Sequence, residues 1–243
     1  MVVTQAPLAV VIPALNEAAR LPALLADLSR APAELLAELV VVDGGSSDGT
    51  PQLARHGGAR LVRSQSGRGR QLQRGIAAST APWLLLLHAD ARLSRDWALV
   101  VQQALEQPEA AWAFDLAIEG NGPSLRLLEL AVWLRCRLRQ LPYGDQGLLL
   151  PRSLLTRAGG MPPLPLMEDL ALIQRLRRLT PIRSLSRPIR VDGRRWRRLG
   201  VLGTAWRNAR LRQAWRQGMN ADELARRYYH HNESGTPTGP LDA

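Results

Sequence analysis

Short apolar runs alternate with amphipathic stretches over the first hundred residues of the chain. Four of these runs are largely continuous, a pattern typical of strands that are buried on both faces of a sheet. They are Leu8–Ile12, Leu39–Val42, Ala59–Val62 and Trp83–Leu87. The stretches between them have helical spacing, so the pattern predicts an α/β fold with a mostly parallel sheet flanked by helices. Ligands of such sheets bind beyond the carboxyl ends of the strands, so the residues after each run are candidates for a site.

The alternation becomes less regular after about residue 106, where the pattern predicts a mixed α+β arrangement. Strands are expected at Ala110–Ile118 and Gln146–Leu150, and helices at Ser124–Leu138, Met167–Leu179, Val201–Gln217 and Ala221–Tyr229. We therefore predict a single domain over residues 1–229, with halves at about 8–106 and 107–199, C-terminal helices at about 200–229 and a flexible tail at 230–243.

The composition is that of a chain able to bury a full core, with 46% hydrophobic and 22% charged residues in 243. The lone Cys136 excludes an internal disulfide and a multi-cysteine metal site, in keeping with a reducing compartment. The run Leu8–Ile12 is shorter than the apolar region of a signal peptide, and no run reaches the ~20 residues of a membrane helix. We therefore expect a cytoplasmic protein.

The net charge of +11 is concentrated in the C-terminal quarter, and every basic residue is an arginine. Between Arg175 and Arg227 there are 16 arginines and three acids. In this quarter a helix with Trp206 on its apolar side carries Arg207, Arg210, Arg212 and Arg216 on the rest of its surface. Such a helix could lie on an anionic membrane at the inner face of the cell, or pack on the domain with its arginines in water.

Polar clusters follow the first two predicted strands, at Pro13–Glu17 and Asp43–Thr50. In the second cluster, paired glycines permit a tight turn with close approach of a ligand. Ser46 and Asp48 could cap the following helix or hydrogen-bond a base and ribose. The segment Gly67–Gln71 precedes a further helical stretch, so Arg68 and Arg70 could bind a diphosphate at a helix N-terminus or lie in a solvated loop.

Carboxylates stand at two further positions that suit catalysis. His88 and Asp90 follow the buried run Trp83–Leu87, where a carboxylate could bind Mg²⁺ or Mn²⁺ shared with phosphate oxygens. His88 could contact metal or ribose, or simply end the strand. Glu168 and Asp169 open a predicted helix after a proline-rich loop, as a general base or as partners of the helix dipole.

Taken in order, these motifs resemble the family 2 glycosyltransferases of the GT-A fold, most closely a small branch called radical-SAM/selenodomain-associated transferases. The similarity extends over residues 8–229 and adds Tyr143–Gln146, Pro165–Asp169, Arg194–Trp196 and Leu224–Tyr229 to the segments above. The chain departs from the usual pattern at His88, which replaces the first Asp of the metal motif, and at Gln73, where related sequences often have Asn.

The resemblance implies transfer of a sugar, of hexosyl type, from a nucleotide diphosphate donor to an unidentified acceptor, lipid-linked acceptors included, with inversion and with a divalent ion, Mn²⁺ or Mg²⁺. Residues 8–106 would then bind the nucleotide and residues 107–199 the acceptor. Asp169 would be the base with Glu168 beside it, and Asp90 would hold the metal. The implied donor-side residues are Pro13, Asn16, Glu17, Asp43, Ser46, Asp48, Arg68, His88, Arg195 and Trp196, and those on the acceptor side are Asp145 and Gln146.

Two other functions remain as alternatives. A nucleotidyltransferase would carry a glycine- and lysine-rich phosphate loop after the first strand, where this chain has Pro13–Glu17. A nucleic-acid-binding protein would explain the basic C-terminal quarter. It would leave Asp90 and the Glu168-Asp169 pair unexplained, so nucleic acid is not an expected partner.

Overall fold

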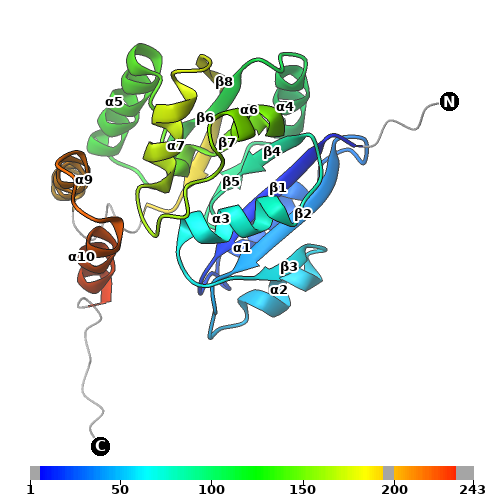
Figure 1. Ribbon diagram of the computed structural model, residues 1–243, viewed down its shortest axis with the longest axis horizontal. Helices are drawn as coiled ribbons and strands as arrows, with labels where there is room; N and C mark the ends of the chain where they lie inside the picture. Colours follow the sequence, from blue (N-terminus) through cyan, green and yellow to red (C-terminus); the bar gives the residue numbers. More distant parts are fainter. Residues whose placement is uncertain (1–5, 194–199, 234–243) are drawn as a thin grey trace, which may run out of the picture.

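One mixed sheet organises the chain in the computed structural model, which describes residues 6–193 and 200–233 (Figure 1). Its eight strands lie in the order β3-β2-β1-β4-β7-β6-β8-β5. Their bounds are β1 Leu8–Ala14, β2 Leu36–Asp43, β3 Arg60–Arg63, β4 Trp83–Leu86, β5 Arg92–Leu93, β6 Ala111–Ile118, β7 Leu148–Pro151 and β8 Ile182–Val191. The pairs that involve β7 or β5 are antiparallel and all others are parallel, which confirms the predicted mostly parallel α/β sheet.

Helices cover both faces of this sheet because β1 is apolar on both sides. Leu8, Val10 and Ile12 face a core that includes α1 and α4, whereas Ala9 and Val11 face one that includes α3, α6 and α7. The helices of the domain are α1 Leu21–Leu28, α2 Thr50–His56, α3 Arg68–Ala77, α4 Trp97–Leu105, α5 Pro123–Arg139, α6 Arg152–Arg157 and α7 Glu168–Leu176.

A buried acid ties α1 to the far edge of the sheet. Asp27 is 1% exposed and accepts hydrogen bonds from Arg92 Nε at 2.8 Å and from Leu93 N at 3.0 Å. Arg30 also donates to this carboxylate, and Trp97 Nε1 donates to the Asp27 carbonyl. Because these donors satisfy it, the buried carboxylate stabilises the fold, and their hydrogen bonds lower its pKa against the effect of burial.

Several boundaries in the second half differ from the sequence prediction. Residues Gly144–Gln146 form a 3-10 turn, η1, so the predicted strand at Gln146–Leu150 begins instead at Leu148. Strand β8 was not predicted, because its arginines, serines and Pro188 hide the apolar positions that face the core. Here tertiary pairing with β6 overrides a weak local signal.

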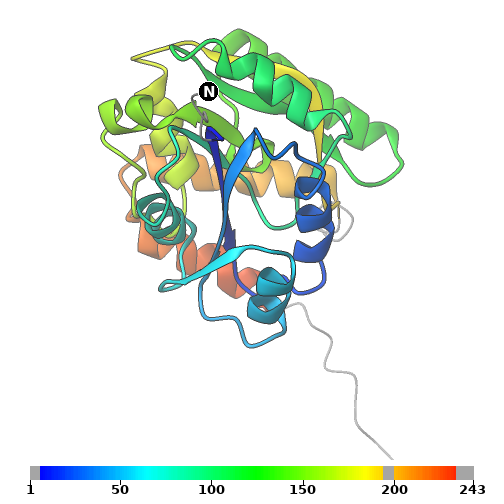
Figure 2. The same cartoon turned by 90° about the vertical axis from the view of Figure 1, so that its right-hand side faces the viewer.

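The basic C-terminal helices α9 Val201–Arg216 and α10 Ala221–Glu233 lie together at one end of the molecule (Figures 1 and 2). They pack on the loop before α7 through Leu211, Trp215, Leu224 and Tyr228. Trp206 takes no part in this core and is 63% exposed. Helix α10 includes residues 230–233, which were predicted as tail; the rest of the predicted tail lies outside the described residues. No helix in the described parts of the chain combines the length and apolarity needed to cross a bilayer.

Candidate functional site

The loops that follow β1 and β2 are hydrogen-bonded to each other. Ala14 and Asp43, the last residues of these parallel strands, are direct partners in the sheet, so the two loops start side by side. Asn16 N donates to Ser46 Oγ at 2.9 Å, and Ser47 N donates to Asn16 Oδ1 at 2.9 Å. Asn16 has a φ of +55°, a left-handed conformation that Asn tolerates better than most residues. These contacts hold the edge of the site in shape without a ligand.

Asp48 and Ser46 brace the loops instead of capping a helix. Helix α2 has Gly49 at its N-cap and no side-chain cap. Asp48 Oδ2 accepts a hydrogen bond from Ala18 N at 3.1 Å, and its other oxygen accepts from Thr50. Hydrogen bonds from Thr50 lower the Asp48 pKa, so the carboxylate stays charged at the mouth of the site.

One side chain of helix α3 is hydrogen-bonded to the ends of both strands that precede these loops. Gln71 is 3% exposed and its Nε2 donates to the carbonyls of Ala14 and Val42, at 2.9 and 2.8 Å. Asp43 is also buried and accepts hydrogen bonds from the backbone of the turn that follows it. Pro13 is buried within β1. Gln71 stands at the end of the basic segment Gly67–Gln71, and no role was predicted for it because its partners are distant in sequence.

A chain of ion pairs links the first loop to the end of β8. Glu17 Oε2 lies 2.7 Å from Arg20 Nη1, and Arg20 Nε lies 3.0 Å from Asp192 Oδ2. Burial raises the Glu17 pKa, and the nearby carboxylates of Asp90 and Asp48 add to the effect, whereas Arg20 opposes it. Arg195 and Trp196, predicted near the donor, lie outside the described residues.

Asp90 lies beyond the end of β4, at the edge of the sheet where parallel β1, β2 and β4 end. Its charge acts on the carboxyls of Glu17 and Asp145, so these three acids border one region. Among the described residues no three Asp, Glu, His or Cys side chains form a ready metal cluster. A single carboxylate suits Mg²⁺ or Mn²⁺, which complete their shell with phosphate oxygens and water. The residues present therefore fit an ion that arrives with a phosphorylated ligand.

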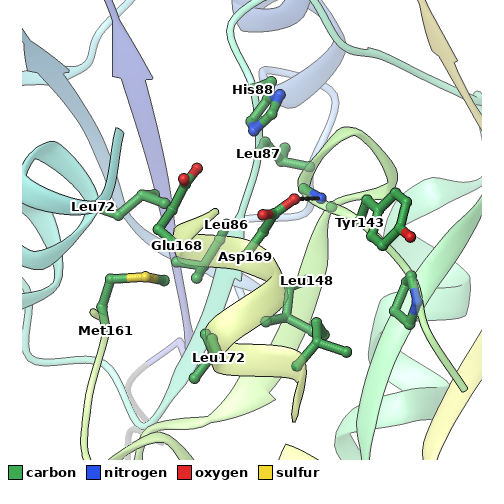
Figure 3. Close-up of a pocket in the computed structure, with 14 residues that line it drawn as sticks. Leu72, Leu86, Leu87, His88, Tyr143, Leu148, Met161, Glu168, Asp169 and Leu172 are labelled. Atoms are coloured by element: carbon green, nitrogen blue, oxygen red, sulfur yellow. Dashed lines mark hydrogen bonds between the residues drawn. The ribbon is translucent and has the colours of Figure 1, made fainter. Parts of the chain in front are cut away.

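The two acids of α7 have different surroundings. Asp169 Oδ2 accepts a hydrogen bond from Gly144 N at 2.7 Å, drawn as a dashed line in Figure 3, and Asp169 Oδ1 accepts from Leu170 N. A Cβ on Gly144 would lie 2.9 Å from His88 Nε2 and 3.2 Å from Asp169 Oδ2. Only a residue without a side chain fits between these two groups, which the fold brings together from β4 and α7.

Glu168 is 1% exposed and is paired with an arginine from α3. Its Oε1 lies 3.1 Å from Arg68 Nε, yet among the described residues neither carboxylate oxygen accepts a hydrogen bond. Burial raises the pKa of Glu168 to about 7, with Asp169 adding to the effect and Arg68 opposing it. Arg68 is therefore not on a solvated loop.

The start of α3 also packs tightly on the loop that leads to α7. Gly69 N donates to Leu164 O at 3.0 Å, and a Cβ on Gly69 would lie 2.2 Å from Pro162 O. This contact fixes the helix that carries Arg68 against the loop that carries the two acids.

The two residues predicted on the acceptor side differ in role. Burial raises the pKa of Asp145 to about 6, with Asp169 and Asp90 adding to the effect and Arg135 opposing it, and its Oδ1 has no hydrogen-bond partner in the described structure. Gln146 is 2% exposed; its Nε2 donates to Phe114 O, and its Oε1 accepts from Arg135 and from Tyr143 N, the residue before η1. Gln146 thus braces the turn that carries Asp145.

Tyr143 lies between two guanidinium groups. Arg135 of α5 is 3.7 Å from the centre of the Tyr143 ring, and Arg212 of α9 is 5.3 Å from it. The segment Tyr143–Gln146 was quoted as a motif, but neither arginine was assigned to the site. Nothing in the sequence distinguishes these two from the other arginines of their helices.

A small hollow of about 30 Å³, enough for one or two water molecules, lies beside Asp169. Apolar side chains from α3, β4, β7 and α7 line it, including Leu72, Leu86, Leu148 and Leu172 (Figure 3). His88, Glu168, Asp169 and Tyr143 line the same hollow.

Residues 9–155 match the family described as Glycosyl transferase family 2. Among solved structures, glucosyl-3-phosphoglycerate synthase from Mycobacterium tuberculosis, in complex with Mn²⁺, UDP and glucosyl-3-phosphoglycerate, is 25% identical, with a TM-score of 0.53. That match covers 77% of this chain and 70% of the other. Staphylococcus aureus TarS, residues 1–349, is 16% identical over 76% of this chain and 60% of the other, with a TM-score of 0.58, and shows the shared fold alone.

Two curated relatives match shorter segments. A TPR repeat-containing protein of Synechococcus elongatus is 36% identical over 121 residues, which are 47% of this chain and 29% of that protein. An uncharacterized glycosyltransferase of Mycobacterium bovis is 40% identical over 82 residues, 33% of this chain and 35% of that protein. The chain thus spans about a third of the length of these curated relatives.

Proposed function

Because this chain belongs to glycosyl transferase family 2, we propose that it transfers a sugar from a nucleoside diphosphate donor to a hydroxyl group of an acceptor. One observation carries the proposal: Asp169 Oδ2 is held by Gly144 N at 2.7 Å beside His88, in the hollow between the strand ends and α7. A carboxylate held there can accept the proton of an attacking hydroxyl. No covalent nucleophile is needed, so the transfer is a single displacement that inverts the anomeric configuration.

The donor lies along the braced loops of β1 and β2 in this proposal. Asn16, Glu17, Asp43, Ser46 and Asp48 border the nucleotide, and Arg68 at the start of α3 faces the diphosphate. The proposed donor is a hexose nucleotide of uridine type, supported by structures of the mycobacterial synthase with UDP-glucose and Mn²⁺.

A divalent ion held by Asp90 and the donor's phosphate oxygens would offset the charge that develops on the departing nucleoside diphosphate. The His88 ring and the Asp169 carboxylate both lie close to Gly144, so in this proposal His88 shapes the site between donor and base. Proton removal from the acceptor falls to Asp169.

Thermal shift with nucleoside diphosphates, with and without Mn²⁺, tests the donor half of the proposal. A ligand at 100 times its Kd adds about 2.7 kcal/mol of stability, which corresponds to a rise in Tm of about 5–10 °C. Asp90→Asn should remove the Mn²⁺-dependent part of the shift. The matched control is Asp96→Asn, which removes an exposed acid paired with Arg187. If no nucleoside diphosphate shifts the wild type, or Asp90→Asn keeps the metal dependence, the donor proposal or the metal assignment is wrong.

We also propose that one face of the molecule rests on an anionic membrane surface, in the cytoplasm. Helix α5 exposes a cluster of large apolar side chains, and the exposed Trp206 lies on the neighbouring α9. The exposed apolar residues of α5 are Leu127, Leu130, Trp133, Leu134 and Leu138. The exposed cations Arg126, Arg137, Arg139 and Arg210 on the same two helices complement anionic lipid headgroups.

Co-sedimentation with vesicles tests this placement. Phosphatidylglycerol vesicles at low salt should retain the protein better than phosphatidylcholine vesicles, and Leu127→Ser combined with Leu138→Ser should weaken retention. Leu99→Ser on α4 removes an exposed leucine elsewhere and is the control. Equal recovery with both vesicle types would contradict the proposal, because polybasic attraction depends on lipid charge and salt.

A further inference from the structure

Two cationic side chains face the acceptor side of Asp169. Arg135 and Arg212 come from α5 and α9 and flank the ring of Tyr143, whose neighbour Gly144 donates to Asp169. Asp169 is close enough to act on Arg212 electrostatically. Figure 3 shows Tyr143 and Glu168 on opposite sides of Asp169. Glu168 pairs with Arg68, the arginine proposed above to face the donor, so Tyr143 and its two arginines lie across Asp169 from that pair.

Neither arginine has a carboxylate partner in the described parts of the chain. Arg135 donates only to neutral oxygens, Leu141 O at 2.9 Å and Gln146 Oε1 at 3.1 Å. Arg212 is partly buried, and burial together with the like charges of Arg135 and Arg216 lowers its pKa. By contrast, the partly buried Arg20 contacts two acids.

Partly buried cations without counter-charges destabilise a folded chain unless a ligand supplies the opposite charge. Asp145 is close enough to Arg135 for their charges to interact, but in the described structure the two side chains form no ion pair. Guanidinium groups present a planar set of donors that matches phosphate oxygens. An anionic group on a substrate would supply such a partner.

We propose that the acceptor carries a phosphate group, bound by Arg135 and Arg212, which places its attacking hydroxyl at Asp169. This proposal rests on the transfer reaction proposed above. The donor diphosphate is held at the other end of the site by Arg68 and the ion at Asp90, so the second anionic subsite belongs to the acceptor. Tyr143 orders the two guanidinium groups, and each keeps N–H donors for the ligand.

Binding of matched probes to the full chain tests the subsite. With UDP and Mn²⁺ present, calorimetry should detect binding of glycerol 3-phosphate and not of glycerol. Arg212→Gln should weaken glycerol 3-phosphate about 10–100-fold, the effect of losing a charge-assisted contact, and leave the Kd of UDP unchanged. Arg210→Gln is the matched control, because Arg210 lies on the same helix but stacks on the exposed Trp206.

Two further measurements separate the possible roles of Arg212. The Tm of Arg212→Gln without ligand should equal or exceed that of the wild type, because the change removes an uncompensated charge; a large fall would indicate a structural role and overturn the proposal. Arg212→Lys, which keeps the charge but loses the planar donors, should bind glycerol 3-phosphate with intermediate affinity.

The phosphate could belong to a small soluble ester or to a lipid headgroup. Dihexanoyl phosphatidic acid, a short-chain lipid, distinguishes them: tighter binding than glycerol 3-phosphate indicates a lipid source, and weaker binding indicates a soluble one. Equal loss of UDP and glycerol 3-phosphate in Arg212→Gln would assign the arginines to the donor and overturn the proposal. Equal affinities for glycerol and glycerol 3-phosphate would also overturn the proposal. If UDP does not bind the wild type at all, the transfer reaction itself fails, whereas phosphate binding remains measurable with inorganic phosphate alone.

Discussion

The acids in the loops after β1 and β2 and the acids around Asp169 differ in how their carboxylates are hydrogen-bonded and buried. On the donor side, Asp43 and Asp48 accept hydrogen bonds from the backbone of their own loops. Around the proposed base Asp169, between the two sides, Glu168 and Asp145 have buried carboxylate oxygens without hydrogen-bond partners in the described structure, and burial raises both pKa values. On the acceptor side, Arg212 forms no ion pair with an acid of the described residues, and burial lowers its pKa.

This contrast indicates which part of the site has its polar groups hydrogen-bonded before substrates bind. The donor loops are braced by hydrogen bonds and by Gln71, so nucleotide meets a preformed surface. The acceptor side keeps desolvated charges that a substrate can compensate, an arrangement that sacrifices some stability at a functional site. Substitutions should therefore affect nucleotide affinity on one side and turnover or pH-dependent stability on the other.

The sharpest test of this division is Asp169→Asn, for which we expect the largest effect. The change keeps the shape of the side chain and removes the proton acceptor, so kcat should fall about 10²–10⁴-fold. The Kd of the donor should stay nearly unchanged, because the donor lies on the other side. Turnover with any accepted hydroxyl, the donor Kd and the product anomer by NMR are the measurements. Retained configuration, or turnover near the wild-type rate, would return Asp169 to the role of a helix-capping acid.

A second test compares one glycine from each side. Gly144→Ala would place a Cβ 2.9 Å from His88 Nε2 and 3.2 Å from Asp169 Oδ2, which displaces the base. Misplacement of a catalytic group by about 1 Å can cost roughly 10²-fold, so we expect a loss in kcat of about 10–100-fold. Gly49→Ala, in the donor loop, adds a Cβ with only ordinary contacts, the nearest at 3.8 Å, and is the control. Similar rates for the two variants would contradict the assigned geometry.

The smallest effects concern stability and have opposite signs for two buried acids. The folded-state pKa of Glu168 is raised from 4.5 to about 7, so between these values the folded chain holds a proton that the unfolded chain has lost. The free energy of unfolding of the wild type therefore falls as pH rises through this window. Glu168→Gln has no ionisable group at this position, so its free energy of unfolding should not fall in this way. At pH 8 the variant should be more stable by at most about 3 kcal/mol, and the difference should vanish near pH 4.

Asp27→Asn is the opposite-sign control. The pKa of Asp27 is lowered, so its charged form contributes stability that is present above about pH 4 and lost below it. Asp27→Asn should cost about 1–3 kcal/mol at pH 8, because Arg92 and Leu93 N lose an ionised partner. Urea unfolding at several pH values measures both. A Glu168→Gln variant that is less stable than the wild type at pH 8 would show that the Arg68 pair outweighs burial.

Much of the fold follows from the sequence because burial on both faces leaves a local signature. The three continuous apolar runs of the first half all lie in buried strands, whereas Ala59–Val62, which contains Arg60, lies in the more exposed edge strand β3. The polar residues after β1, β2 and β4 lie at one edge of the sheet. Asp90 and Asp169 were identified in this way, by their position after a strand and at a helix start. Strand β8 was missed because its arginines and Pro188 interrupt that signature.

The sequence by itself determined the alternation of strands and helices in the first half, the acids to consider for the site and the concentration of charge near the C-terminus. Only the tertiary structure decided that Trp215 packs while Trp206 is exposed, that Glu168 is buried against Arg68, and that Arg135 and Arg212 meet at Tyr143. The physical reason is that hydrophobic periodicity reports whether a position is buried, whereas a side chain's partner depends on the path of the whole chain.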